Sequence, residues 1–150
     1  MSEVLRAVAT GSAALGLALG WLVWRALRTE GDSPDRLILE LRIAQFSALL
    51  LVLVAGIYVG LALAHEETTG AGLDVAIAVG FFVVAGIITT REPAVAITAL
   101  SVAWVAHSLL DLAHVTNLLP GAIAPGWYPI ACSVYNVCVA AICYLPLLRR

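Results

Sequence analysis

Charged side chains are scarce in this 150-residue chain, and lysine is absent altogether. Only 12% of the residues are charged and 62% are hydrophobic, whereas a soluble domain has about 25% charged and about 45–50% apolar residues. All eight basic residues are arginine, and the formal net charge is −2. This balance argues against a basic surface of the kind that binds nucleic acid. The composition therefore excludes an ordinary soluble domain, and we expect no nucleic-acid partner.

Cysteine is also scarce, and no CxxC spacing occurs. Cys132, Cys138 and Cys143 all lie in one apolar segment. A disulfide needs Cα atoms within about 7 Å, which a straight helix does not offer at these separations. A thiol redox enzyme is therefore not expected. Cys132 stays a candidate metal ligand, because it lies nearest the end of that segment.

Long uncharged runs take the place of the missing charge, and they occupy residues 7–24, 43–64 and 75–90. About 20 apolar residues span a bilayer as an α-helix. Two further apolar segments follow Pro93 and precede Leu148. The sequence predicts an all-α protein, a single antiparallel bundle of five transmembrane helices in the lipid bilayer. The expected helices cover residues 8–27, 39–64, 74–90, 94–119 and 127–148.

The arginines predict how this bundle is oriented. Seven of the eight flank the first connection, the third connection or the C-terminus, and they are Arg25, Arg28, Arg36, Arg42, Arg91, Arg149 and Arg150. Because arginine-rich connections stay in the cytoplasm, the N-terminus is expected outside and the C-terminus inside. The expected location is the bacterial inner membrane, crossed several times. Glu40 and Arg42 are expected at a solvated helix end.

The fourth expected helix carries a stripe of polar and aromatic residues. At 100° per residue, His107, Asp111 and His114 fall within about 60° of one another, and Trp104 flanks the same face. An aspartate at the membrane centre costs about 2.5–3.5 kcal/mol on insertion scales, so such residues seldom face lipid. We therefore expect this stripe to face the bundle interior or water.

A metal site is the most concrete interpretation of the stripe. Two imidazoles and one carboxylate suit zinc, copper or iron as a divalent cofactor. The predicted ligands are His107, Asp111, His114 and His65, the last at the end of the second helix on the same membrane side. Asp74 offers a further carboxylate on that side.

Three other interpretations stay open, and one of them is transport, because intramembrane ionisable groups often mark ion paths. A buried His–Asp pair can move a proton, so the protein could be an isomerase or cyclase acting on an apolar lipid or isoprenoid. Alternatively, His107 and Asp111 could bond each other or a residue of the fifth helix and serve only as a helix clasp. The protein would then be an accessory subunit with membrane-protein partners.

The fifth expected helix supplies the opposite wall of the predicted pocket. Tyr128 and Tyr135 could line it, and Asn136 is the polar residue expected to meet the fourth helix. We therefore predict a small-ligand pocket between the fourth and fifth helices, near the outer leaflet. Its predicted lining is Trp104, His107, Asp111, His114, Tyr128, Cys132, Tyr135 and Asn136.

The segment from residue 104 to residue 144 resembles small bacterial multi-pass membrane proteins to which no activity is assigned. The shared pattern is W-x2-H-x3-D-x2-H followed by WYP-x2-C. It is matched here by Trp104, His107, Asp111, His114, Trp127, Tyr128, Pro129 and Cys132. The resemblance implies the same topology and draws attention to the same face. Its members often carry an aspartate where Asn136 stands, and this departure weakens a mechanism based on paired carboxylates.

Overall fold

The structure, a computed structural model, describes residues 3–64, 71–119 and 124–149. Within these ranges the chain forms five α-helices and one short 3₁₀ helix, and it contains no strand. Their bounds are α1 (Glu3–Arg28), α2 (Pro34–Ala64), α3 (Ala71–Ile88), α4 (Pro93–Val115), α5 (Trp127–Tyr144) and η1 (Leu145–Arg149). The prediction of an all-α chain with five helices is confirmed. Each of the five is long and apolar enough to cross a membrane.

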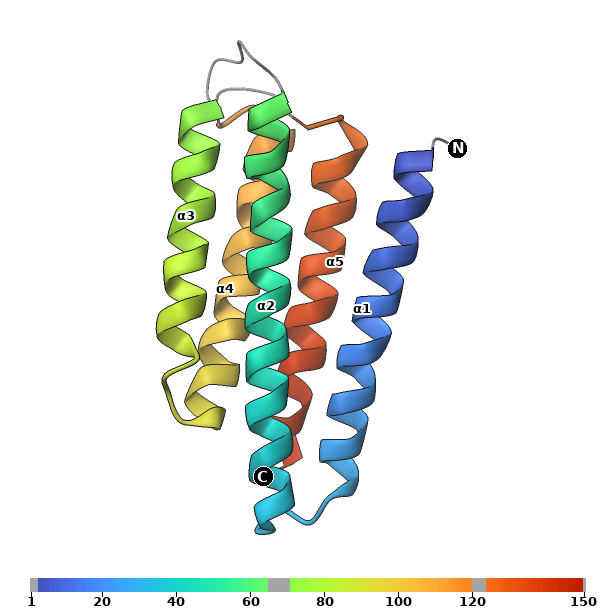
Figure 1. Cartoon of the computed structure of the whole chain (residues 1–150), viewed down its shortest axis with the longest axis vertical. Helices are drawn as coiled ribbons and strands as arrows, with labels where there is room; N and C mark the ends of the chain where they lie inside the picture. Colours follow the sequence, from blue (N-terminus) through green and yellow to red (C-terminus); the bar gives the residue numbers. More distant parts are fainter. Residues whose placement is uncertain (1–2, 65–70, 120–123, 150) are drawn as a thin grey trace.

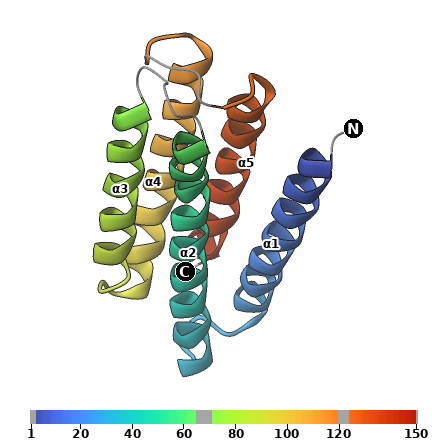
Figure 2. The same ribbon diagram turned by 45° about the horizontal axis from the view of Figure 1, so that its top comes forward.

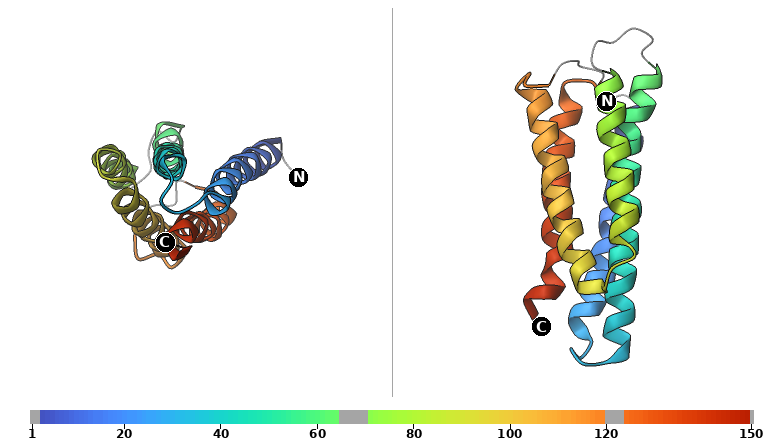
Figure 3. Two further views of the ribbon diagram at one scale, coloured as in Figure 1. Left: turned by 90° about the horizontal axis from the view of Figure 1, so that it is seen from below. Right: turned by 90° about the vertical axis from the view of Figure 1, so that its left-hand side faces the viewer.

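Successive helices run in opposite directions, so the two termini lie at opposite ends of the bundle (Figure 1). Helices α2 to α5 lie side by side, with α3 packed on α2 and α5 packed on α4. Helix α1 differs from them. It touches α2 and α5 near its C-terminal end and leans away toward the N-terminus, as Figures 2 and 3 show.

The bundle is apolar outside and carries polar groups inside. Large hydrophobic side chains such as Leu49 and Leu109 are exposed on the surface, whereas Asp111 and Asn136 are almost completely buried. In water this arrangement would expose a continuous apolar surface. It suits a bilayer, in which lipid tails cover the apolar exterior and polar groups are satisfied between helices.

Both N-terminal helices begin earlier than predicted. Helix α1 begins at Glu3 and α2 at Pro34, because backbone hydrogen bonding continues through polar residues that hydrophobicity alone does not include. Ser33 promotes the early start of α2, since its Oγ accepts the Arg36 backbone N–H at 3.2 Å. Pro34 suits a first helical turn, where no backbone N–H is needed.

Helix α4 ends at Val115 rather than at residue 119. Asn117 has a left-handed backbone with a φ of 56°. The Asn117 N–H donates to the carbonyl of His114, and the Leu118 N–H donates to that of Ala113. These two bonds form a Schellman cap, a helix end that asparagine tolerates better than most residues.

A buried ion pair closes the end of the bundle that holds the C-terminus. Arg36 donates through Nε to Oε1 of Glu40 at 2.9 Å. Its Nη1 donates to the carbonyl of Ala26, and its Nη2 donates to the carbonyl of Pro146 at 2.8 Å. The pair therefore joins α1, α2 and η1. Glu40 is 1% exposed, so its expected place at a solvated end is wrong, while Arg42 is exposed as expected.

Candidate functional site

The polar stripe of α4 faces inward, as its helical period predicts. Trp104, His107 and Asp111 are buried, and His114 is partly buried one turn closer to the helix end. Trp104 has a structural partner, because its Nε1 donates to Oγ of Ser47 on α2 at 2.8 Å. The three remaining polar residues meet side chains from α2, α3 and α5.

Asp111 is held from two sides. The Tyr58 hydroxyl on α2 donates to its Oδ1 at 2.6 Å, and the Asn136 amide on α5 donates to its Oδ2 at 2.8 Å. Hydrogen bonds to a carboxylate are stronger than neutral ones. This carboxylate therefore connects three helices.

His107 lies in the same network. Its Nδ1 is 3.5 Å from Oδ2 of Asp111 and 3.0 Å from Nδ2 of Asn136. The same Nδ2 atom is 3.6 Å from Sγ of Cys132. Candidate ligand atoms of His107, Asp111 and Cys132 lie within 4.8 Å of one another. The amide of Asn136 thus contacts all three of these candidate metal ligands.

His114 does not join that group and pairs with Asp74 of α3 instead. Its Nε2 lies 3.2 Å from Oδ1 of Asp74, and its ring stacks on Tyr58 with centroids 5.6 Å apart. Asp74 is 2% exposed, yet neither of its carboxylate oxygens accepts a hydrogen bond within the described part of the chain. Buried carboxylate oxygens seldom remain without a donor.

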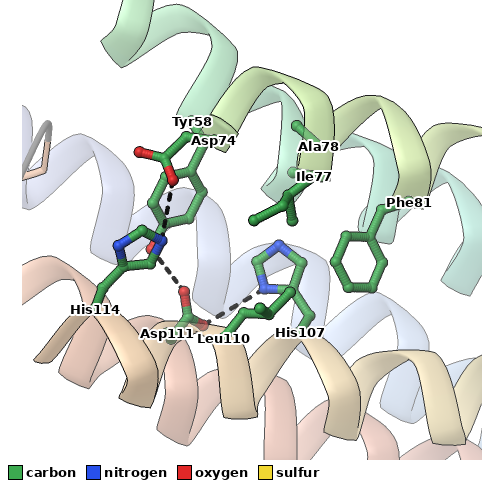
Figure 4. Close-up of a pocket in the computed structure, with 10 residues that line it drawn as sticks. Tyr58, Asp74, Ile77, Ala78, Phe81, His107, Leu110, Asp111 and His114 are labelled. Atoms are coloured by element: carbon green, nitrogen blue, oxygen red, sulfur yellow. Dashed lines mark hydrogen bonds and ion pairs between the residues drawn. The ribbon is translucent and has the colours of Figure 1, made fainter. Parts of the chain in front are cut away.

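A small cavity of about 20 Å³ lies beside these residues. Its polar lining consists of Tyr58, Asp74, His107, Asp111 and His114, shown in Figure 4. These residues come from α2, α3 and α4, so the cavity lies on the far side of α4 from the predicted pocket. Helices α4 and α5 pack directly on each other, and Oγ of Ser108 lies 2.7 Å from Oγ of Ser133 across their interface.

A second, larger cavity of about 220 Å³ lies between α1, α2 and α5. It is mainly apolar, and Tyr128, Cys132 and Tyr135 line it from α5. The Tyr135 hydroxyl is buried there and has no hydrogen-bond partner among the described residues. Six of the eight predicted pocket residues are therefore divided between two cavities, and Trp104 and Asn136 line neither of them.

Tyr58 is the site residue that sequence reasoning missed. Between Ala48 and Ala64 it is the one residue with a hydrogen-bonding side chain, and that isolation was the available signal. His65, a predicted metal ligand, lies outside the described residues.

Electrostatics make the small cavity unusual. Two carboxylates, Asp74 and Asp111, line it, and no arginine does. A charge buried in a low dielectric must be compensated, because an uncompensated ion carries a desolvation penalty of several kcal/mol. Tyr58 and Asn136 donate hydrogen bonds to Asp111. Compensation of Asp74 requires a proton shared with His114, which lies 3.2 Å away, or a bound cation.

These features define a class of protein, a five-helix bundle of membrane-span length with a water-sized cavity that is lined by acidic and imidazole groups. Comparisons of the chain with protein-family models, with curated proteins and with solved structures found no match. The functional argument therefore depends on the residues of the site.

Proposed function

We propose that the protein is a multi-pass protein of the bacterial inner membrane that binds one divalent transition-metal ion in the small cavity. Asp74 and His114 are the proposed ligands. The observation that carries the proposal is Asp74, a buried carboxylate that accepts no hydrogen bond from the described residues, on the wall of a cavity that also holds two imidazoles. A carboxylate and an imidazole suit zinc, copper or iron.

Size favours an ion over an apolar ligand in this cavity. A water molecule needs about 10–15 Å³ of such space, so about 20 Å³ accommodates one ion or one water and excludes an isoprenoid. The spacing of the ligand atoms is also suitable. Ligands about 2.0–2.2 Å from zinc lie roughly 3.0–3.5 Å apart, and Asp74 Oδ1 and His114 Nε2 are 3.2 Å apart.

Charge supports a divalent ion. Two ionised carboxylates at the cavity carry two negative charges, and one divalent cation neutralises both without protonating either imidazole. The ion would remove the desolvation penalty that Asp74 otherwise carries.

The orientation is part of the proposal. The arginine distribution supports a cytoplasmic C-terminus, which puts the cavity in the half of the bundle that faces outside. Green fluorescent protein fused to the C-terminus should then fluoresce, and alkaline phosphatase fused there should be inactive. The reverse pattern would refute this orientation.

Elemental analysis of detergent-purified protein tests the metal site. We expect near-stoichiometric zinc, copper or iron in the wild type and its loss in Asp74→Asn and His114→Gln. The matched control is Glu40→Gln, an isosteric change at the other buried carboxylate that leaves an oxygen facing Arg36. It should keep the metal. An absence of metal from the wild type after reconstitution with each of the three ions would refute the proposal.

Stability provides a second measurement on the same variants. In metal-free protein, Asp74→Asn removes a buried carboxylate whose one polar neighbour among the described residues is Nε2 of His114 at 3.2 Å. At about pH 8, where an imidazole is ordinarily neutral, the free energy of unfolding should therefore rise by about 1 kcal/mol. If Asp74 served only to hold helices together, Asp74→Asn would instead lower the free energy of unfolding of the protein. Reversible unfolding in detergent distinguishes the two results.

The larger cavity supports a second candidate function. Its apolar lining and its volume of about 220 Å³ suit part of a lipid or isoprenoid, the ligand class of an acid–base enzyme on apolar substrates. Mass spectrometry of molecules co-purified with the protein would test this candidate.

The interhelical bonds of Asp111 in turn support the helix clasp of an accessory subunit, and His107→Leu would then lower stability without removing any bound species.

A further inference from the structure

We infer that Asn136 fixes the proton of neutral His107 on Nε2, so that His107 presents an N–H donor to the small cavity and is not a metal ligand. This inference builds on the proposed function, because it assigns the role of one more residue at the same site. It is carried by the contacts of a single amide group.

The amide nitrogen of Asn136 has two hydrogens and two close acceptors. They are Oδ2 of Asp111 at 2.8 Å and Nδ1 of His107 at 3.0 Å. The opposite amide orientation would place Oδ1 of Asn136 against the carboxylate, which has no proton to donate when ionised. With Asp111 ionised, the orientation that places Nδ2 against both acceptors is the one that forms two hydrogen bonds, and it leaves Oδ1 of Asn136 buried without a partner among the described residues.

The tautomer of His107 follows from this orientation. A ring nitrogen that accepts a hydrogen bond carries no proton, and a neutral imidazole carries its single proton on the other nitrogen. The competing arrangement needs a proton on Nδ1 that is donated to Asp111. The distance from Nδ1 to Oδ2 of Asp111 is 3.5 Å, which is longer than a normal N–H···O bond.

Nε2 of His107 is therefore the nitrogen that carries the proton, and it faces the cavity. His107 lines the cavity, and in Figure 4 the nitrogen that does not face Asp111 points toward Ile77 on α3. A ring with one accepting nitrogen and one protonated nitrogen has no lone pair left for a metal. Its N–H can instead donate to a water in the cavity. Asn136 is thus a positioning residue that acts through His107.

Nitrogen-15 NMR of histidine-labelled protein tests the tautomer directly. The chain has three histidines, so the signals that disappear in His107→Gln identify those of His107. We expect the Nε2–H tautomer in the wild type and the Nδ1–H tautomer in Asn136→Asp, because the introduced carboxylate accepts the Nδ1 proton. The matched control is Ser108→Ala, at the same interface, which should leave the His107 signals unchanged. An Nδ1–H tautomer in the wild type would overturn the inference.

Zinc titration supplies the functional readout. Asn136→Asp frees the Nε2 lone pair, so zinc affinity should rise about ten- to a hundredfold, the usual size of such effects near a metal site. His107→Gln retains an N–H near the Nε2 position and should keep the wild-type zinc stoichiometry. Zinc bound by the wild type and lost in His107→Gln would refute this inference and leave the proposed function intact. No zinc in the wild type, together with an Nε2–H tautomer, would refute the proposed function and leave the assignment of the proton intact.

Discussion

Two buried polar clusters of this bundle, one around Arg36 and one around the small cavity, differ in how completely their groups are paired. At the end that holds the C-terminus, the guanidinium of Arg36 contacts the carboxylate of Glu40 and the carbonyls of Ala26 and Pro146. One positive and one negative charge balance there. Around the small cavity, Asp74 and Asp111 have no arginine, and both oxygens of Asp74 lack a hydrogen-bond donor among the described residues.

This difference separates a structural role from a binding role. A polar cluster that only stabilises a fold gains nothing from acceptors without donors, since each costs about 1–3 kcal/mol. A site that binds an ion requires such acceptors before the ion arrives. The acceptors of the cluster around Arg36 are paired, as expected for a structural role, whereas the cavity has acceptors without donors, as expected for a binding role. Both contain a carboxylate that is at most 2% exposed.

The largest expected effect comes from breaking the complete cluster. Arg36→Met removes the guanidinium from Glu40 and from two carbonyls, and breaking one partner of a buried ion pair costs about 3–5 kcal/mol. The midpoint of unfolding in a denaturing detergent should fall accordingly, while metal content per folded molecule should not change. The double variant Arg36→Met with Glu40→Leu should recover part of the loss, because it also removes the buried carboxylate. A double variant less stable than the single one would contradict the ion-pair explanation.

An intermediate effect is expected from the hydrogen bond that Tyr58 of α2 donates to Asp111 at the small cavity. Tyr58→Phe removes the hydroxyl that donates to Oδ1 of Asp111 and leaves the ring in place. A buried acceptor that loses its donor costs about 1–3 kcal/mol. Unfolding of metal-free protein should show this loss, in contrast to the stability that Asp74→Asn should retain. If Tyr58→Phe and Asp74→Asn lowered the free energy of unfolding equally, the proposed difference between Asp111, which accepts hydrogen bonds, and Asp74, which accepts none from the described residues, would be wrong.

The architecture could be predicted because it depends on properties of single segments. Apolar runs of membrane length define the five helices, and the 3.6-residue period defines the inward face of α4. Helix ends were less predictable, since the cap at Asn117 depends on backbone conformation that hydrophobicity does not report.

The site was only partly predictable, because its contacts join segments that are far apart in sequence. The sequence of a single helix does not specify how the helix is rotated against its neighbours. The period of α4 therefore could not predict that His114 contacts Asp74 on α3 while Asp111 contacts Asn136 on α5. The pocket was expected on the α5 side for this reason. The hydroxyls of Ser108 and Ser133 permit the close approach that closes that side, and small residues of this kind are common in membrane helices.

The smallest expected effect comes from this closed interface. Ser108→Ala removes the bond between the hydroxyls of Ser108 and Ser133 without opening a large cavity. Polar contacts between membrane helices contribute about 0.6 kcal/mol on average, so the free energy of unfolding should fall by about that amount. Metal content should be unchanged, since neither serine lines the small cavity. If Ser108→Ala also removed the metal, the α4–α5 interface would have to be included in the binding site, and the division between a structural side and a binding side of α4 would be wrong.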